Sequence, residues 1–245
     1  MLYGVFADIH SNLEALNVVL EFFKQHKIQN YICSGDIVGY GPNPNECISK
    51  LKALKRLYCV AGNHDRAVVG MKSPNWFNEY AQRVLLWTKR QLNESSRAFL
   101  IRLPLLYEHT HFSIAHGSPR DPIDEYLLSP IQFLDNLKYF HTQVCFIGHT
   151  HFPICFLRDK LGRVKLRNFQ DGEKIKINPE LKLVYNLGSV GQPRDNNTRA
   201  CCALYDTDTK EISFHRLEYD VEKTQAKMRQ AALPLFLIDR LAYGR

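Results

Sequence analysis

Short apolar runs recur along the chain, and each is three to six residues long. They are rich in β-branched and aromatic residues, and this length and composition are typical of fully buried strands. A glycine, a histidine or an acidic or amide residue follows each run within a few positions. We therefore predict strands at residues 2–7, 31–33, 57–61, 112–115, 144–147 and 183–185.

The sequence between the early strands has helical periodicity. Apolar side chains recur every three or four positions in residues 12–25, and Pro44 occupies the first turn of a second helix at residues 44–54. Strand–helix–strand order at this spacing predicts βαβ units and a largely parallel sheet. Further helices are predicted at residues 78–92, 96–101, 130–137 and 221–232, with a short terminal one from Pro234.

The second half of the chain has a different pattern. Residues 156–183 alternate in polarity and contain two turn signals, at 158–162 and 169–173, which predict antiparallel hairpins. Residues 201–205 and 211–217 predict another hairpin. No linker or repeat divides the sequence, so we expect one domain over residues 1–245, with two sheets face to face and helices outside.

Composition and charge narrow the class of protein. Hydrophobic residues make up 45% and charged residues 23% of the 245 positions, which excludes disordered, collagen-like and coiled-coil proteins. The net charge of +7 suits an anionic substrate. No run of five basic residues occurs, so the charge does not form a tail that binds nucleic acid.

Cysteine usage and the N-terminal sequence bear on the compartment. The seven cysteines include no Cys-x-x-Cys pair and lie mostly in apolar runs. They predict buried free thiols in a reducing compartment rather than disulfides or a zinc ribbon. The N-terminus lacks the pattern of a signal peptide, and no apolar run is long enough to cross a membrane. We expect a cytoplasmic protein.

Residues with metal-binding side chains follow the predicted strands directly. Because the carboxyl ends of neighbouring strands meet in one crevice, these side chains should lie together. They offer nitrogen and oxygen ligands without thiolate, which suits Mn, Fe or Zn rather than a Cys-rich zinc site or a calcium cage. The set is Asp8, His10, Asp36, Asn63, His64, His116, His149 and His151.

The spacing of these residues predicts convergence on a small volume. Asp8 and His10 are two positions apart, as are His149 and His151, so in an extended chain each pair points the same way. Seven of these eight side chains would already be too many for one tetrahedral ion, and they suffice for two ions about 3.5–4 Å apart with a shared carboxylate, an arrangement used for phosphoryl displacement. Adjacent glycines would let the backbone turn tightly, at positions 35, 62, 117 and 148.

The order of the motifs resembles that of the calcineurin-like metallophosphoesterases. The motifs are Asp8-x-His10, Gly35-Asp36, Gly62-Asn63-His64-Asp65, His116 and Gly148-His149-x-His151. The resemblance covers about residues 1–219 and points to the small bacterial and archaeal phosphodiesterase branch, with residues 220–245 as a helical extension. It implies an α/β fold, a four-layer α/β/β/α sandwich of two mixed β-sheets flanked by helices.

The resemblance also implies roles for these residues. Asp36 would bridge two divalent cations, of Mn, Fe or Zn, with Mn favoured. A bridging hydroxide would attack phosphorus in line, with His64 near the leaving oxygen as proton donor or charge stabiliser. The first cation would also be held by Asp8, His10 and His151, and the second by Asn63, His116 and His149.

Several further residues have two interpretations each. Asn12 is either a helix N-cap or a ligand of phosphate. Arg66, Arg120 and Arg194 lie on motif loops, where they either clamp phosphate or form surface ion pairs. For Asp65, a structural role as a helix N-cap or a partner of Arg66 is favoured over a catalytic one. Tyr40 and Tyr126 are candidates for stacking a base, whereas packing is favoured for Trp76, Phe77, Tyr80 and Trp87.

The expected function is a phosphodiesterase that acts on a small phosphodiester, a nucleotide or a dinucleoside polyphosphate. The alternatives are a phosphomonoesterase or protein phosphatase on the same site, or a non-catalytic scaffold. The stretch after Asp36 lacks the acid and the arginine of Gly-Asp-x-x-Asp-Arg-Gly, which makes a protein phosphatase less favoured. We expect a small phosphorylated substrate and neither a membrane nor a nucleic acid polymer as partner; a homo-oligomer stays open.

Overall fold

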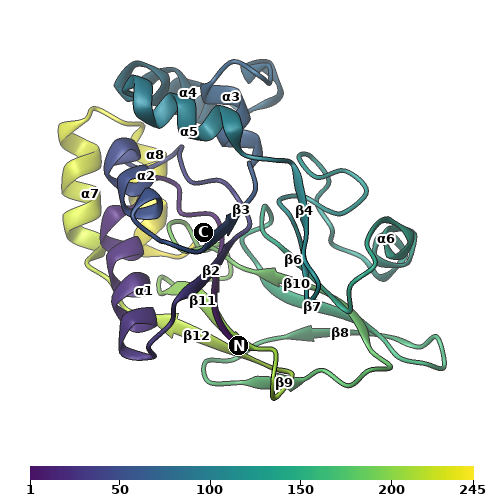
Figure 1. Ribbon diagram of the computed structural model, residues 1–245. Helices are drawn as coiled ribbons and strands as arrows, with labels where there is room; N and C mark the ends of the chain where they lie inside the picture. The colour runs from purple at the N-terminus through teal and green to yellow at the C-terminus, as the bar shows by residue number, and fades with distance from the viewer.

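Two six-stranded sheets pack face to face in the computed structural model, which describes residues 1–245 (Figure 1). Neighbouring strands of the first sheet follow the order β3-β2-β1-β11-β12-β9. Its three parallel strands come from the first quarter of the chain and its antiparallel strands from the last third. The bounds are β1 (Leu2–Phe6), β2 (Asn30–Cys33), β3 (Leu57–Cys59), β9 (Lys174–Lys176), β11 (Ala200–Asp206) and β12 (Glu211–Leu217).

The second sheet has the order β4-β5-β6-β10-β7-β8. Strands β5, β6 and β10 are parallel, and the outer strands pair antiparallel. The predicted fold of two mixed sheets is therefore confirmed, but the prediction of a largely parallel sheet is wrong, because only three strands of each sheet pair in parallel. The bounds are β4 (Leu106–Glu108), β5 (Ser113–Ala115), β6 (Val144–Ile147), β7 (Pro153–Arg158), β8 (Val164–Asn168) and β10 (Lys182–Leu187).

Two of the three predicted hairpins form. Strands β7 and β8 form a hairpin, as do β11 and β12. The turn at 169–173 does not form one, because the chain crosses to the other sheet, where β9 pairs with β12. Phe169 explains the crossing: its ring is buried between the sheets and stacks on Tyr185 at 4.7 Å, which draws the backbone across.

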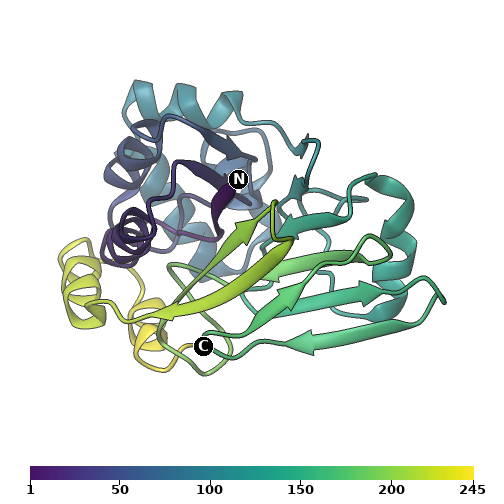
Figure 2. The same cartoon turned by 60° about the horizontal axis from the view of Figure 1, so that its bottom comes forward.

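Helices flank both sheets (Figures 1 and 2). Helices α1 (Leu13–Gln25) and α2 (Pro44–Lys52) lie outside the first sheet, and α6 (Pro130–Asn136) lies outside the second. Helix α3 is not predicted from the sequence, because it is too short to show helical periodicity. The others are α3 (Asn63–Val68), α4 (Glu79–Gln91), α5 (Glu94–Arg102), α7 (Val221–Gln230) and α8 (Leu235–Asp239), with the 3₁₀ turns η1 (Pro74–Trp76), η2 (Leu137–Tyr139) and η3 (Arg240–Ala242). No helix combines the length and apolar character needed to cross a bilayer.

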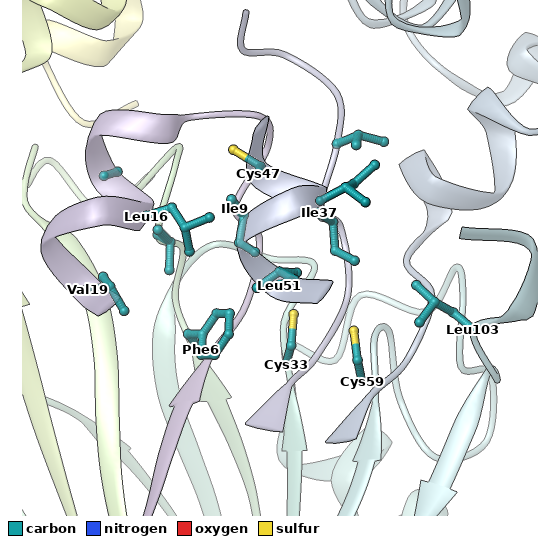
Figure 3. Packing of buried hydrophobic residues seen from close by; sticks show 14 of the residues in the cluster. Phe6, Ile9, Leu16, Val19, Cys33, Ile37, Cys47, Leu51, Cys59 and Leu103 are labelled. Carbon is teal, nitrogen blue, oxygen red and sulfur yellow. The ribbon is translucent and has the colours of Figure 1, made fainter. Parts of the chain in front are cut away.

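Separate apolar clusters fill the layers. Figure 3 shows the cluster under α1 and α2, where Leu16 and Leu51 pack over Phe6. A second cluster lies between the sheets and is rich in aromatic side chains. A third joins α6 to the second sheet, where the ring of Phe133 stacks on that of Phe156 at 5.7 Å. The burial of these faces fixes the sheets relative to each other and so fixes the strand ends.

Asn12 is the N-cap of α1 and a buried junction between three segments. Its Oδ1 accepts the backbone N–H of Ala15 at 3.1 Å and the hydroxyl of Thr224, on α7, at 3.2 Å. Its Nδ2 donates to the carbonyl of Gly191 at 3.0 Å. The side chain is almost fully buried. Of its two interpretations, the structure shows the capping role, with both polar atoms engaged inside the fold.

We expect Asn12→Ala to lower the free energy of unfolding by about 2 kcal/mol, because it removes a cap and two further buried hydrogen bonds. Asn12→Ser retains a side-chain acceptor at the cap position and should cost less. Urea denaturation followed by circular dichroism measures both. A wild-type midpoint for Asn12→Ala would contradict the junction.

All seven cysteines are free and buried, which confirms the prediction of free thiols. Burial raises the pKa of Cys145 and Cys155 well above its usual range and raises that of Cys201 to about 12.

Since the thiolate is the reactive form, we expect fewer than one thiol per chain to react with Ellman's reagent at pH 8. In guanidinium chloride all seven should react. Rapid reaction of a native thiol would refute this burial.

Candidate metal centre

The predicted metal-binding residues all lie at one edge, where the ends of the two sheets meet. Asp8, Asp36 and Asn63 follow the parallel strands β1, β2 and β3 of the first sheet. The second sheet contributes His116, which follows β5, and the pair His149 and His151, which lies between β6 and β7. All of these side chains, with those of His10, His64, His149 and His151, are buried.

The first cluster consists of Asp8, His10 and His151. Their ligand atoms lie within 4.8 Å of one another. Nε2 of His151 is 3.3 Å from Oδ1 of Asp8 and 2.9 Å from Nε2 of His10. The opposite ring nitrogens are occupied: Nδ1 of His10 lies 3.2 Å from the carbonyl of Val38, and Nδ1 of His151 lies 2.6 Å from that of Gln192.

This hydrogen bonding fixes the tautomers of both rings. Because a carbonyl only accepts, each Nδ1 carries the hydrogen and each Nε2 presents a lone pair. Burial lowers the pKa of His10 and His151 well below its usual range, so both rings are neutral. Two lone pairs then face each other 2.9 Å apart beside a carboxylate. The two lone pairs repel each other unless both bind the same cation, so the arrangement fits a metal ion.

The second cluster is centred on His116. Its Nδ1 lies 2.8 Å from the carbonyl of Ser34, which directs Nε2 into the site. Nε2 lies 3.0 Å from Oδ1 of Asn63, 3.1 Å from Nδ1 of His149 and 3.4 Å from Oδ2 of Asp36. Burial disfavours a charge on His116, but Asp36 outweighs burial and raises its pKa to about 10. The cluster thus attracts positive charge, as a proton or as a metal ion.

Asp36 lies between the two clusters. Its Oδ2 is 3.4 Å from Nε2 of His116 and 3.6 Å from Nε2 of His10. Its Oδ1 accepts the backbone N–H of His64 at 2.9 Å. Burial alone would raise the pKa of Asp36, but the imidazoles of His116 and His64 hold it well below its usual range. A carboxylate kept ionised between two groups of inward-facing ligands is suited to bridge two cations.

Asp8 joins the sheets. Both of its carboxylate oxygens lie 3.1 Å from the backbone N–H of His149, which they accept across the interface between the sheets. Burial raises the pKa of Asp8 to about 7. Gly148 permits the contact, since a Cβ there would lie 2.3 Å from Oδ2 of Asp8. A Cβ at Gly62 would likewise lie 2.0 Å from Oδ1 of Asp36.

These contacts correct the role assigned to the glycines. Of the four beside the motifs, only Gly35 has a positive φ, of 87°. Gly62, Gly117 and Gly148 therefore do not provide left-handed turns. Gly62 and Gly148 are needed because the carboxylates approach their backbone closely.

The backbone of the candidate ligands is left-handed rather than extended. The φ angles are 54° at Asp8, 48° at His10, 50° at Asp36, 70° at His149 and 63° at His151. The prediction of extended pairs is therefore wrong: Asp8 and His10 share the first cluster, but His149 and His151 belong to different clusters. Left-handed residues other than glycine cost about 1–2 kcal/mol each and persist where surrounding contacts hold them. Such a concentration of strain is typical of functional sites.

His64 lies at the rim of both clusters. Its ring packs 4.9 Å from that of His10, 4.5 Å from that of Tyr40 and 4.9 Å from that of Phe77. Nδ1 is buried without a hydrogen-bond partner. Burial lowers the pKa of His64 to about 4. No acid orients this ring, in agreement with the motif departure seen in the sequence.

Asp65 is neither an N-cap nor a partner of Arg66. It is the third residue of α3, and its carboxylate accepts three backbone N–H groups: those of Ile37 at 3.0 Å, Val38 at 3.1 Å and Gly62 at 3.0 Å. Burial and the charge of Asp36 raise the pKa of Asp65 to about 7. The side chain thereby fixes the loop that carries Asp36 against the start of α3.

The three candidate arginines have different surroundings. Arg194 is half-buried beside the first cluster, with Nη2 3.0 Å from Oε1 of Gln192 and 3.4 Å from the hydroxyl of Tyr40. It forms no ion pair, and its buried Nε has no partner. Arg120 instead pairs with Glu125 and Asp135 at the surface. Arg66 is half-buried on α3 without an ion pair.

A cavity of about 180 Å³ opens beside the second cluster. Besides Asn63, His64 and His149, it is lined by aromatic side chains and by Lys72, whose Nζ lies 2.6 Å from Oδ2 of Asp124. The packing interpretation is thus wrong for Trp76, which is exposed at the cavity. It holds for Phe77, which lines the cavity but also packs against the clusters under α2 and beside α4. It holds as well for Tyr80, which stacks on Phe236 at 5.1 Å, and for Trp87, which packs against the cluster of α4, α7 and α8. The aromatic lining residues are Tyr40, Trp76, Phe77 and Tyr126.

Comparison with known proteins gives consistent matches. The model of the calcineurin-like phosphoesterase superfamily domain matches residues 1–210. An uncharacterised protein of Methanocaldococcus jannaschii is 38% identical over 247 residues, which span 99% of this chain and 98% of that protein. The chain is also similar to the crystal structure of a metallophosphoesterase from Sphaerobacter thermophilus, with a TM-score of 0.90, 37% identity and 100% of both chains covered.

A more distant structure shares the fold. A hypothetical protein from Pyrococcus horikoshii has a TM-score of 0.81 at 22% identity, covering 100% of this chain and 98% of that one. The family resemblance inferred from the motifs is confirmed by the domain match and by the relatives above one-third identity. The chain therefore belongs to the calcineurin-like phosphoesterase superfamily and is a metal-dependent phosphoester hydrolase.

Proposed function

We propose that the protein is a dinuclear-metal phosphodiesterase that acts on a small phosphodiester, a nucleotide or a dinucleoside polyphosphate. The observation that carries the proposal is the position of Asp36, an ionised carboxylate between two groups of inward-facing ligands. Asp8, His10 and His151 would hold the first cation. Asn63, His116 and His149 would hold the second.

Two bound cations would lower the pKa of water and neutralise charge on the phosphoryl oxygens. The chain's own residues would do the rest. Carbonyls of Val38, Gln192 and Ser34 orient three imidazoles, so the ligand geometry exists before substrate arrives. His64, next to Asp36 and facing the cavity, would contact the leaving oxygen as proton donor or charge stabiliser.

Arg194 is the best placed of the four candidates for binding a substrate oxygen. Its guanidinium has no carboxylate partner and lies beside Tyr40, whose ring contacts that of His10 at 4.6 Å. A free guanidinium next to a phosphoryl site provides charge-assisted, bidentate hydrogen bonds. The ion-paired Arg120 and the capping Asn12 have no such freedom, and Arg66 has no contact that favours it.

Two features favour a diester over a phosphoprotein. The acid and the arginine of the protein phosphatase motif are absent after Asp36, and Gly39 and Tyr40 occupy that loop against His64. The adjoining cavity is small, with space for one group of a compact ligand. The nitrogen and oxygen donor set suits Mn, Fe or Zn, and we favour Mn.

We expect Asp36→Asn and His64→Ala to separate metal binding from turnover. Asp36→Asn should bind less than one Mn²⁺ per chain and lose more than about a hundred-fold in kcat on bis-p-nitrophenyl phosphate, because the shared ligand is removed. His64→Ala should retain two Mn²⁺ but also lose turnover. Elemental analysis and steady-state kinetics provide both readouts, with Asp208→Asn as an exposed control. Full turnover in Asp36→Asn, or turnover of monoesters alone by the wild type, would refute the proposal.

We expect Arg194→Met to raise KM for the same diester about ten-fold, because a charge-assisted contact to the phosphoryl group is lost. The matched variant Arg120→Met removes an arginine already paired with carboxylates and should leave KM unchanged. Equal KM values for Arg194→Met and the wild type would remove Arg194 from the binding site.

A further inference from the structure

The cavity beside the second cluster is continuous with the candidate catalytic residues. Asn63, His64 and His149 form its inner wall, so a ligand group inside it lies next to a phosphate held at the metals. Its volume of about 180 Å³ is below the 300–1,000 Å³ typical of pockets for a whole small molecule. The cavity therefore has room for one substituent of a phosphate bound at the metals, and not for a whole substrate molecule.

Trp76 presents an unpartnered aromatic surface at this cavity. Its side chain is 82% exposed, although tryptophan is one of the most buried residue types on average. The residue is nevertheless held in place by the η1 turn, where Ser73 accepts the backbone N–H of Asn75 at 3.3 Å. Nζ of Lys72 lies 5.7 Å from the ring centroid, which restrains its orientation further.

Tyr126 lines the same cavity from a different loop. Its ring lies 3.9 Å from that of His149, tilted by 30°, and the residue is 47% exposed. The ion pair of Lys72 with Asp124, 2.6 Å long, joins the loop of Trp76 to the loop of Tyr126. The two aromatic side chains are therefore held at one cavity by a contact between their loops.

We propose that this cavity binds the nucleobase of a nucleotide substrate, with Trp76 and Tyr126 as the stacking surfaces. The proposal deepens the proposed function and rests on it. A base offers a flat π-face that aromatic side chains stack on, and its edge carries donors and acceptors. Asp124, whose carboxylate is half exposed, lies where it can accept from an amino group of that edge. An aliphatic ester would leave the aromatic surfaces unused.

The test compares two competitive inhibitors that differ only in the base. Adenosine 5′-monophosphate and ribose 5-phosphate are titrated against Mn²⁺-dependent hydrolysis of bis-p-nitrophenyl phosphate. The wild type should bind the nucleotide about ten-fold more tightly, as expected for one stacked base. Trp76→Ala should reduce this ratio to near one, and Trp76→Phe should retain most of it.

The control variant is Leu161→Ala, since Leu161 is an exposed apolar residue in the turn between β7 and β8. It should leave the ratio of inhibition constants unchanged. Because Trp76 is so exposed, its replacement does not endanger the fold. A ratio near one in the wild type, or an unchanged ratio in Trp76→Ala, would overturn the base site while hydrolysis of the diester still supports the proposed function.

A second readout does not depend on turnover. The chain has two tryptophans, so Trp87→Phe leaves Trp76 as the only one. Adenosine 5′-monophosphate should quench its fluorescence, and ribose 5-phosphate should not. If the enzyme hydrolyses no ester, the proposed function fails, and this titration still decides the base site: equal quenching by both ligands, or none, would overturn it.

Discussion

The carboxylate of Asp8 accepts the backbone N–H of His149, and through this contact the two sheets meet at the site. Asp8 also donates its backbone N–H to the carbonyl of Gly35, and the carbonyl of Asp8 accepts from the Ser189 hydroxyl and the Gly191 N–H. Loops that follow β1, β2, β6 and β10 are thus joined at one residue. The positions of His10, Asp36, His149 and His151 depend on this junction, because each of them lies on one of these loops.

This junction is stable only if buried charge is balanced. Asp8 and Asp36 are fully enclosed, and a lone carboxylate in such surroundings is strongly disfavoured. The neutral imidazoles of His10 and His151 cannot provide the balance beside Asp8, and the guanidinium of Arg194 reaches only one side of the site. Bound metal ions would therefore balance this buried charge as well as supply the chemistry. The left-handed backbone of five ligand residues fits this picture, since contacts to the metal would offset the strain.

Sequence alone was sufficient for the architecture of two mixed sheets and for the convergence of the motif residues at one edge. Buried strands have a direct compositional signature, and the carboxyl ends of parallel strands share one edge. The crossing at Phe169 was not predictable, because it depends on which sheet buries that ring. The short helix α3 has no period to detect, and hence the contacts of Asp65 were missed.

The cavity was also beyond a single sequence. Lys72 and Asp124 are 52 positions apart, and no local pattern indicates that their loops meet. Trp76 and Phe77 precede a helix with apolar periodicity, so the pattern assigned them to packing, and only three-dimensional placement shows that Trp76 is outside the core. Likewise, left-handed conformations at Asp8 and His10 depend on long-range hydrogen bonds rather than on residue type.

The loops that surround the cavity are different segments from the strand ends that carry the candidate ligands. Residues around 72–78 and 124–126 contribute little to the cores, whereas the ligand residues are anchored in both sheets. Mutations can therefore accumulate in these loops without a loss of the metal-binding framework. Over evolutionary time, a protein built this way can acquire new substrates by drift in two surface segments, while the reaction it catalyses stays constant.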